Sequence, residues 1–445
     1  MQDKRNLYLV RSILVGALGG LLFGFDTAVI AGTTHSLTAY FGLSAGQLGF
    51  TVASALWGTV VGSMFSGFLG DRLGGRDSLR ILAGCYLLSA IGCAFAWNWP
   101  ALLLFRFIGG LGIGGSSVIG PVYIAEVAPA EWRGRSVGSF QINIVVGILV
   151  AYFSNYAIAL QSLGTNEWRW QLGVAALPAL LFLVMLLGNS PSPRWLATKN
   201  RIAEARGVLV RLGSAAPDAE LNEIVNSIRA SSSANSEDLF QQKYRRPIFL
   251  AVAIAMFNQL AGINAVLYYL NYIFAMAGFD RISGNLQAVA IGATNLVATL
   301  IALSVIDRLG RKKLLLIGSV GMVFCLAGVA SIFAMQQHQK LLIFLLVGYV
   351  GFFAFSQGAV IWVYLSEVFP NRVRAKGQSL GSSTHWIMNA LISGVFPLLA
   401  ARSQALPFVF FAAMVAVQFF VVLFVFPETK CISLEEMQHN LGIEY

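Results

Sequence analysis

One acidic side chain stands in a run that is otherwise glycine, aliphatic, aromatic and threonine residues. The run is "GGLLFGFDTAVIAG" at 19–32, and Asp26 is its only charged residue. A carboxylate among apolar side chains is costly while charged unless a partner or water compensates it, and it takes up a proton when that compensation is lost. Arg106, in another apolar run, is the candidate partner. The chemistry predicted for this pair is uptake and release of a proton.

The solvent around this acid follows from the composition. Of 445 residues, 57% are hydrophobic and 11% are charged, against about 25% charged in an ordinary soluble domain. Apolar stretches long enough to cross a bilayer as helices occur at 11–33, 47–69, 78–97, 100–124, 137–160 and 169–188. After a polar gap, six more occur at 247–276, 284–306, 314–335, 341–365, 378–400 and 405–426. The sequence therefore predicts an all-α membrane protein with twelve transmembrane helices.

The polar gap divides the chain into parts. We predict an N-terminal six-helix bundle at 1–189, a helical linker at 190–245, a C-terminal bundle at 246–430 and a tail at 431–445. Apolar residues recur at helical spacing from Ile202 to Leu212 and from Leu221 to Ile228, which predicts short amphipathic helices lying on the membrane face. A Ser-rich segment, "SSSANS", follows them.

Lys and Arg residues predict the orientation. With the N-terminus inside, only Arg169, Arg281, Lys340 and Arg402 fall on the outer side, so both termini are expected in the cytoplasm of a cell whose inner or plasma membrane holds the protein. The net charge of +10 then indicates topology and contact with anionic lipid, and it does not require nucleic acid.

Several chemistries are not expected. Cys85, Cys93 and Cys325 fall in predicted spans and Cys431 in the tail, so we expect no disulfide and no metal site. The chain has no Walker motif, zinc-ligand spacing or nucleophile elbow, which argues against a cofactor, an ATP-driven transporter and an enzyme. The glycine run "GGLGIGG" at 109–115 lies inside an apolar span, so it predicts close helix packing rather than dinucleotide binding.

Loop motifs repeat between the two halves. "GFLGDRLGGR" at 67–76 matches "LSVIDRLGRKK" at 303–313, and "AEVAPAEWRGR" matches "SEVFPNRVRAK" at nearly the same separation. A weaker pair is "SPSPRWL" at 190 and "PETK" at 427. The repeats indicate that the halves are homologous.

These motifs, with "GFDTAVIAGT", "NQLAGINAVLYY" and "WVYLSEVFPNRVR", resemble the sugar porter family of the major facilitator superfamily. The resemblance implies two pseudo-symmetric six-helix bundles around a central site that opens alternately to each side. It also implies secondary active transport of a monosaccharide in symport with a proton, by a protein we expect to be monomeric. A passive sugar facilitator has the same fold and stays open as an alternative, as does, more remotely, a sugar sensor that does not transport.

The charged loop residues are predicted to form ion pairs across the cytoplasmic seam between the bundles. They are Asp71, Arg72, Glu126, Arg133, Asp307, Arg308, Glu367 and Arg374. The alternative is that the loops only fix topology by their positive charge. Two positions depart from the family pattern, because Gly75 replaces a basic residue and "SPSPRWL" lacks a glutamate.

A sugar needs amide side chains for its hydroxyls and aromatic walls for its C–H faces. The predicted site comprises Gln141, Asn258, Gln259, Asn264, Tyr268, Asn295, Trp362, His385, Trp386 and Asn389. Gly262 permits a local break that would bring both sides of its helix to the site, and Trp362 follows the flexible Gly358. The family resemblance assigns sugar contacts to Gln141, Gln259, Asn264, Asn295, Trp362 and Trp386, while Asn258 and His385 depart from its pattern. The alternatives are that the amides join helices and that His385 is a second titrating group.

Depth places Arg106 opposite Asp26. At 1.5 Å per residue, Asp26 stands about 22 Å above Arg11, and Arg106 reaches a similar level from the outer side. In proton-coupled members of the family that the chain resembles, an aspartate of helix 1 lies near an arginine of helix 4. We therefore expect Asp26 and Arg106 to couple protons to conformation. The alternative is a static ion pair that holds two helices together.

Overall fold

Helices make up all the regular structure that the computed structural model describes. It covers residues 7–129, 131–233, 237–370, 372–430, 432 and 437, without the side chains of 230–233. The predicted tail, including Cys431, falls outside these residues except for Ile432 and Met437. Among the described residues, eleven helical stretches are long and apolar enough to cross a membrane.

Eleven stretches carry the twelve predicted spans because one of them holds two. Helix α2 (Ala45–Ala94) contains Gly74, whose φ of 81° and ψ of 164° are not helical. Gly74 lies between the predicted spans 47–69 and 78–97, so one span ends there and the next begins. The prediction of an all-α protein with about twelve membrane helices is confirmed.

The chain divides into two compact units. The first contains Met1–Ala28, Trp57–Ala151 and Arg169–Asn235, and the second contains Val29–Leu56, Tyr152–Trp168 and Ser236–Tyr445. Several helices begin in one unit and continue into the other. The division into bundles at 189 and 246 stays a prediction.

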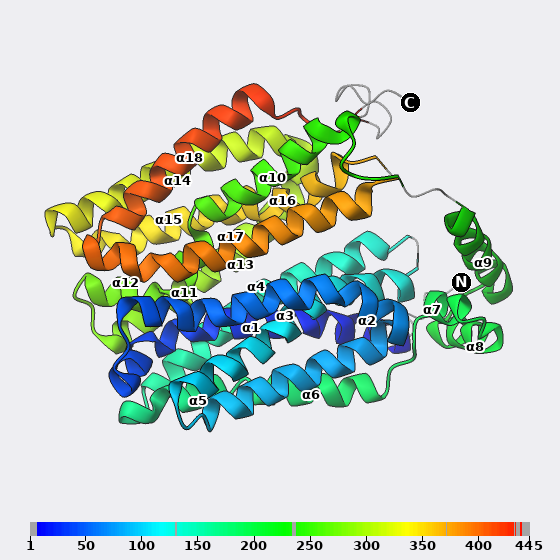
Figure 1. Ribbon diagram of the computed structural model, residues 1–445, viewed down its shortest axis with the longest axis horizontal. Helices are drawn as coiled ribbons and strands as arrows, with labels where there is room; N and C mark the ends of the chain where they lie inside the picture. Colours follow the sequence, from blue (N-terminus) through cyan, green and yellow to red (C-terminus); the bar gives the residue numbers. More distant parts are fainter. Residues whose placement is uncertain are drawn as a thin grey trace. The chain divides into compact units, whose positions relative to one another are not determined.

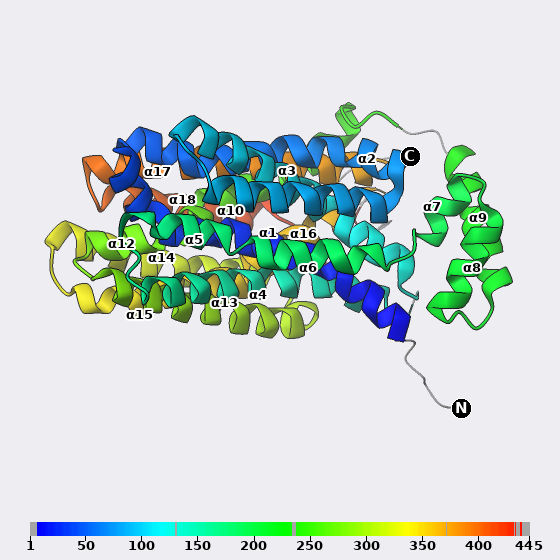
Figure 2. The same cartoon turned by 90° about the horizontal axis from the view of Figure 1, so that it is seen from below.

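The first unit is built on long helices that run alongside one another (Figures 1 and 2). They are α1 (Leu7–Phe41), α2, α3 (Trp99–Val127), α4 (Arg133–Ala159), α5 (Glu167–Gly173) and α6 (Ala176–Leu187). The glycine run of α3 packs as predicted. A Cβ on Gly114 would overlap the backbone of α2 at Thr59, and one on Gly115 would overlap the side chain of Leu82. These glycines let α3 approach α2 closely.

The linker forms α7 (Pro193–Thr198), α8 (Ile202–Leu212) and α9 (Pro217–Ser233), beyond the ends of α2 and α6 in Figures 1 and 2. The predicted amphipathic helices are present, and their place on the membrane face stays a prediction. Leu196, Leu209 and Leu221 are buried in one hydrophobic cluster with side chains of α2, α3 and α6. The first unit itself covers these apolar faces.

The second unit contains broken helices. Its elements are α10 (Arg245–Leu260), α11 (Ile263–Tyr268), α12 (Leu270–Met276), α13 (Arg281–Leu309), α14 (Arg311–Met335), α15 (Leu342–Phe355), α16 (Gln357–Glu367), α17 (Arg374–Arg402) and α18 (Leu406–Val425). The predicted break at Gly262 is present, with φ of 85°. A second break, which was not predicted, falls at Ser356, with φ of −118° and ψ of −87°.

The last part of the linker docks within the second unit. Glu237 accepts from Tyr244 and Arg372, pairs with Lys243, and its backbone carbonyl accepts from Lys376. Hydrogen bonds from Lys243, then Tyr244 and Arg372, lower the pKa of Glu237 from its usual 4.5 to about 2. The linker end is therefore attached to the connection between α16 and α17.

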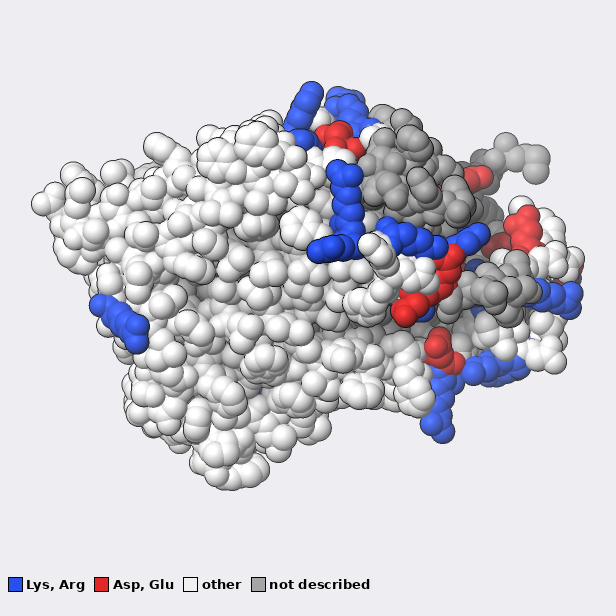
Figure 3. Space-filling view, turned by 45° about the horizontal axis from the view of Figure 1, so that its top comes forward, with Lys and Arg blue, Asp and Glu red and all other residues white. Residues whose placement is uncertain are grey.

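Charged side chains are unevenly distributed. On the face shown in Figure 3, Lys, Arg, Asp and Glu gather towards one end, and most of the remaining surface carries none. Exposed leucine, valine and phenylalanine side chains are numerous on the long helices, including Phe68, Leu180 and Phe424. A surface of this kind suits a hydrocarbon solvent.

Candidate functional site

Asp26 on α1 and Arg106 on α3 face each other inside the first unit. Arg106 Nη1 lies 3.5 Å from Asp26 Oδ2, and the same nitrogen lies 3.5 Å from the Asp26 backbone carbonyl. The two residues are 7% and 2% exposed. The structure thus brings together the pair that the depth count predicts.

The pair is incompletely hydrogen-bonded. Within the described part of the chain, Asp26 Oδ2 and Arg106 Nε are buried without a hydrogen-bond partner. An ion pair in a water-poor site is stable only with good geometry and full hydrogen bonding. The contact between Asp26 and Arg106 therefore leaves one polar atom of each side chain unsatisfied.

Small side chains make room beside the carboxylate. A Cβ added to Gly109 would lie 3.5 Å from Asp26 Oδ2 and 2.5 Å from Ser89 Oγ. Ser89 was not among the predicted site residues, and Gly109 was expected only to allow close helix packing. The position of Gly109 one helical turn after Arg106 is the signal that could have indicated its proximity to the pair.

Gln259 is the centre of an amide cluster in the second unit. Its Nε2 donates to Asn258 Oδ1 at 3.0 Å, and its Oε1 accepts from Asn264 Nδ2 at 3.0 Å. The same Nε2 lies 3.2 Å from either ring nitrogen of His385 on α17. The break at Gly262 places Asn264 on a separate helix from Gln259, which lets both side chains meet.

Aromatic rings flank His385. Its ring centroid lies 5.2 Å from that of Trp362 on α16 and 5.1 Å from that of Trp386. Trp386 is buried, whereas Trp362 is 38% exposed. Amide groups and indole faces thus stand side by side in this cluster, as hydroxyl-rich ligands require.

A second polar group lies further along α17. Asn389 Nδ2 donates to the Tyr268 hydroxyl at 3.2 Å, and Ser393 Oγ donates to Asn389 Oδ1 at 3.1 Å. All three are buried. These groups satisfy one another, so Asn389 and Tyr268 join α11 to α17.

Two predicted site residues are not joined to this cluster. Asn295 lies half-buried on α13, and among the described residues no hydrogen bond links it to Gln259 or its partners. Gln141 lies half-buried on α4 in the first unit. Their part in a sugar site stays a prediction.

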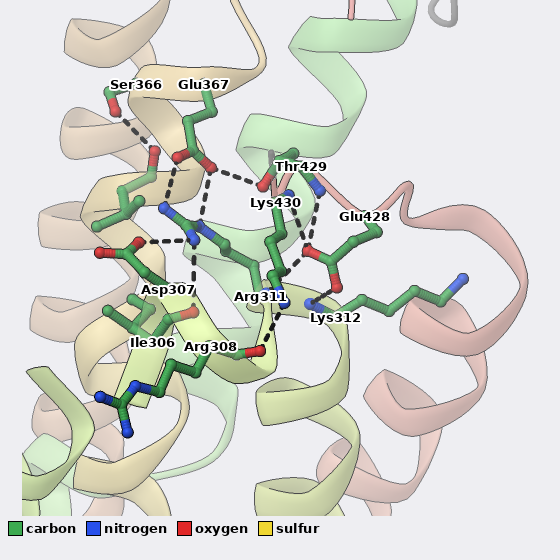
Figure 4. A network of polar contacts seen from close by, with 11 residues as sticks. Ile306, Asp307, Arg308, Arg311, Lys312, Ser366, Glu367, Glu428, Thr429 and Lys430 are labelled. Carbon is green, nitrogen blue, oxygen red and sulfur yellow. Dashed lines mark hydrogen bonds and ion pairs between the residues drawn. The ribbon is translucent and has the colours of Figure 1, made fainter. Parts of the chain in front are cut away.

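The charged loop of the second unit is organised by Arg311 (Figure 4). Arg311 donates to both carboxylate oxygens of Glu367, at 2.8 and 3.1 Å, and to Asp307 at 3.0 Å. Arg308 contributes its backbone carbonyl to Lys430, and Arg374 donates to the Phe369 carbonyl. The arginine that pairs with Glu367 is therefore Arg311, which sequence analysis did not select. Its place opposite Gly75 in the repeat could have indicated it.

Glu428 of the PETK segment caps the start of α14. Its Oε1 accepts from the backbone N–H of Arg311 at 2.9 Å, and its Oε2 accepts from that of Lys312 at 3.2 Å. A carboxylate at a helix N-terminus is stabilised by the free N–H groups and the helix dipole.

The matching loop of the first unit is different. Asp71 accepts through its backbone carbonyl from Trp195 Nε1 at 3.3 Å, and Glu126 lies beside Ser192 and Arg194. Within the part of the chain that the structure describes, no ion pair joins Asp71, Arg72, Glu126 and Arg133 to one another. The acidic residue that does pair is Asp77, with Arg76 and Arg80.

The opposite end of the second unit holds a further ion pair. Arg281 pairs with Glu167 and donates to the Ala159 carbonyl at 3.2 Å. Glu167 is buried, at 1% exposure. Arg281 was predicted only to lie on the outer side of the membrane. The contact joins Glu167, from the predicted N-terminal bundle, to Arg281, from the predicted C-terminal bundle.

Among the described residues, no group of three or more His, Cys, Asp or Glu side chains could hold a metal ion. Cys85, Cys93 and Cys325 are free thiols.

Known proteins resemble the chain over nearly its whole length. Residues 12–441 match the family described as "Sugar (and other) transporter". The arabinose-proton symporter of Bacillus subtilis is 36% identical, with 95% of this chain and 92% of that protein covered. The D-xylose-proton symporter of Escherichia coli is 34% identical, with 97% and 95% covered.

A solved structure agrees with this match. The inward open conformation of the xylose transporter XylE from Escherichia coli superposes with a TM-score of 0.86 at 33% identity, covering 97% of this chain and all of that one. The fold is therefore that of a multi-pass membrane transporter rather than an enzyme, and the chain belongs to the sugar transporter family of the major facilitator superfamily.

Proposed function

We propose that this protein carries a monosaccharide across the membrane together with a proton by alternating access. The observation that carries the proposal is the buried, loosely paired contact between Asp26 and Arg106 at 3.5 Å. The relatives whose names state a proton and a pentose, arabinose or xylose, support it.

The proton step follows from the geometry of the pair. While Arg106 is near, its positive charge stabilises ionised Asp26. When a conformational change moves the guanidinium away or removes water, the neutral acid is favoured and the carboxylate binds a proton. Protonation then depends on which side the carrier faces. A proton that moves down 100 mV contributes about 2.3 kcal/mol, enough for a roughly 50-fold sugar gradient.

Sugar recognition is assigned to the amide cluster. Gln259, Asn264 and Asn258 present donors and acceptors that match hydroxyl groups, while Trp362 offers an apolar face for the C–H side of a sugar ring. The amides bond to one another and to His385. A bound sugar replaces these mutual hydrogen bonds, which limits the desolvation cost of binding.

The cellular setting is also a proposal. The concentration of Lys and Arg at one end of the helices supports a cytoplasmic position for both termini in the inner or plasma membrane. The monomeric state, the contact with anionic lipid and the lack of a nucleic-acid partner belong to the same proposal.

Uptake into vesicles with an imposed pH gradient tests the function. Wild-type protein is expected to accumulate D-xylose, L-arabinose or D-galactose above the outside concentration. Asp26→Asn should abolish accumulation yet retain exchange of sugar between the two sides. Asp218→Asn, which changes an exposed carboxylate on α9, is the matched control. Accumulation by Asp26→Asn at the wild-type level would refute proton coupling through this residue, and protonophore-insensitive equilibration by wild type would identify a passive facilitator.

A further inference from the structure

A buried glutamine begins α16 at the break in its membrane span. Ser356 separates α15 from α16, and Gln357 is the first residue after it. The Gln357 side chain is inside the protein, at 2% exposure. No sequence motif singles out Gln357, and the mechanism described above does not use it.

Gln357 bonds to an amide on each of two neighbouring helices, and its Nε2 also contacts Met322 Sδ on α14 at 3.9 Å. Its Nε2 donates to Gln418 Oε1 on α18 at 2.7 Å. Its backbone carbonyl accepts from Asn258 Nδ2 on α10 at 3.4 Å. The start of α16 is thus held between α18 on one side and the amide cluster on the other.

Two links join the start of α16 to the proposed sugar site. Asn258 accepts from Gln259, which contacts His385. Trp362 is five residues along α16 from Gln357, and its ring lies 5.2 Å from the ring of His385. A shift at the start of α16 would therefore move Trp362 and release Asn258 together.

The amide pair is a poor choice for packing alone. Gln357 Oε1 is buried, and within the described residues it has no hydrogen-bond partner. An unsatisfied buried acceptor is destabilising, whereas apolar side chains of similar shape at both positions can be neutral or stabilising. The two glutamines instead form a hydrogen bond between α16 and α18, which fixes the position of the start of α16.

We propose that Gln357 is a positioning residue for sugar binding, with Gln418 as its support. The bond between them sets the start of α16, and so holds Trp362 and Asn258 in the geometry that binds the sugar. This inference rests on the proposed function.

The test compares Gln357→Leu, Gln418→Leu and the double variant with wild type in proteoliposomes. The readouts are KM and Vmax for D-xylose, L-arabinose and D-galactose, and the apparent Tm of the purified protein in detergent. Gln287→Leu is the matched control, because Gln287 is a half-buried amide on α13 that bonds only locally, to Ser283 at 3.2 Å.

Each single variant should raise KM about tenfold with Vmax within twofold, and should lower the Tm. The double variant should recover the Tm, because both partners are then apolar, and yet keep the raised KM. Gln287→Leu should leave KM unchanged. If a single variant does not fold, the double variant still decides the question.

The proposal is overturned if the double variant regains the wild-type KM along with its stability, since the pair then only packs α16 on α18. A KM within twofold of wild type in every variant overturns it as well. Wild-type protein that moves no monosaccharide would instead refute the proposed function, and with it this inference.

Discussion

In both repeated loops a glycine with positive φ separates two membrane helices. Gly74 in the first unit has φ of 81° and ψ of 164°, and Gly310 in the second has φ of 88° and ψ of 161°. A tyrosine further along each half also agrees. Tyr123 and Tyr364 occupy corresponding positions of the repeat, and Tyr123 donates to the Ser190 carbonyl, whereas Tyr364 donates to the Pro427 carbonyl, one residue later in the alignment.

The charges of the two loops do not agree. Gly310 is followed by Arg311, which binds Glu367 and Asp307, whereas Gly74 is followed by Gly75. A Cβ on Gly75 would already lie 3.1 Å from the ring of Tyr123. Glu428 caps α14, and the aligned position in the first unit is Ser192. The first loop is therefore built without the arginine and without the glutamate.

This difference separates two contributions to the loops. The reversal of the backbone is present in both, so it depends on glycine at a conformation that other residues rarely adopt. The ion-pair network is present in one, so it adds stability to a turn that forms without it.

Arg311→Ala is expected to have the largest effect. The substitution leaves Glu367, whose side chain is 25% exposed, without its guanidinium partner. The free energy of unfolding should fall by about 3 kcal/mol. The measurement is the apparent Tm in detergent. Arg76→Ala, in the first loop, is the control and should cost less, because Asp77 also pairs with Arg80. Equal decreases in Tm for Arg311→Ala and Arg76→Ala would show that the difference between the two loops does not affect stability.

Gly74→Ala and Gly310→Ala should have the next largest effect, each lowering the free energy of unfolding by about 2 kcal/mol. The conformation is strained for any residue with a Cβ. In addition, the new methyl group would lie 2.7 Å from the Trp195 ring at position 74 and 2.6 Å from Glu428 Oε2 at position 310. Similar decreases in Tm are expected in the two loops. A harmless Gly74→Ala would contradict the shared role of the glycines.

Glu428→Ser converts the second loop towards the first and should cost about 1 kcal/mol, because two N–H groups at the start of α14 lose their acceptor and the favourable dipole interaction. Glu428→Gln is the comparison, since it keeps an acceptor oxygen and removes the charge. The Tm values of the two variants separate the effect of a shorter side chain from the effect of losing the negative charge. A more stable Glu428→Ser protein would show that the cap is not stabilising.

Asp307→Asn should have the smallest effect, below about 1 kcal/mol, because the Asp307 side chain is 83% exposed and water screens its pair with Arg311. A decrease in Tm as large as that of Arg311→Ala would mean that Asp307, rather than Glu367, is the main partner.

Much of the fold could be predicted because its causes are local. Stretches of apolar side chains indicated twelve spans, and the glycine at 262 indicated a broken helix, since each depends on residues that are neighbours in the chain. The pair of Asp26 and Arg106 could be anticipated because a rigid helix converts residue number into depth.

The partners of the loop and hinge residues could not be predicted in this way. Choosing Arg311 over Arg308 or Arg374 requires knowing which side chain points at Glu367. The apolar faces of α8 and α9 suit a membrane surface as well as a protein core, and their burial with Leu196 and α3 depends on how the linker folds back.

The repeat, the membrane spans and the acid among them follow from the order of residue types, because hydrophobicity and helical spacing act over short segments. The bonds of Arg311 to Glu367 and of Gln357 to Gln418 depend on side chains 56 and 61 positions apart. Such pairs form only when helices are packed at one particular rotation, and that rotation is a property of the assembled chain.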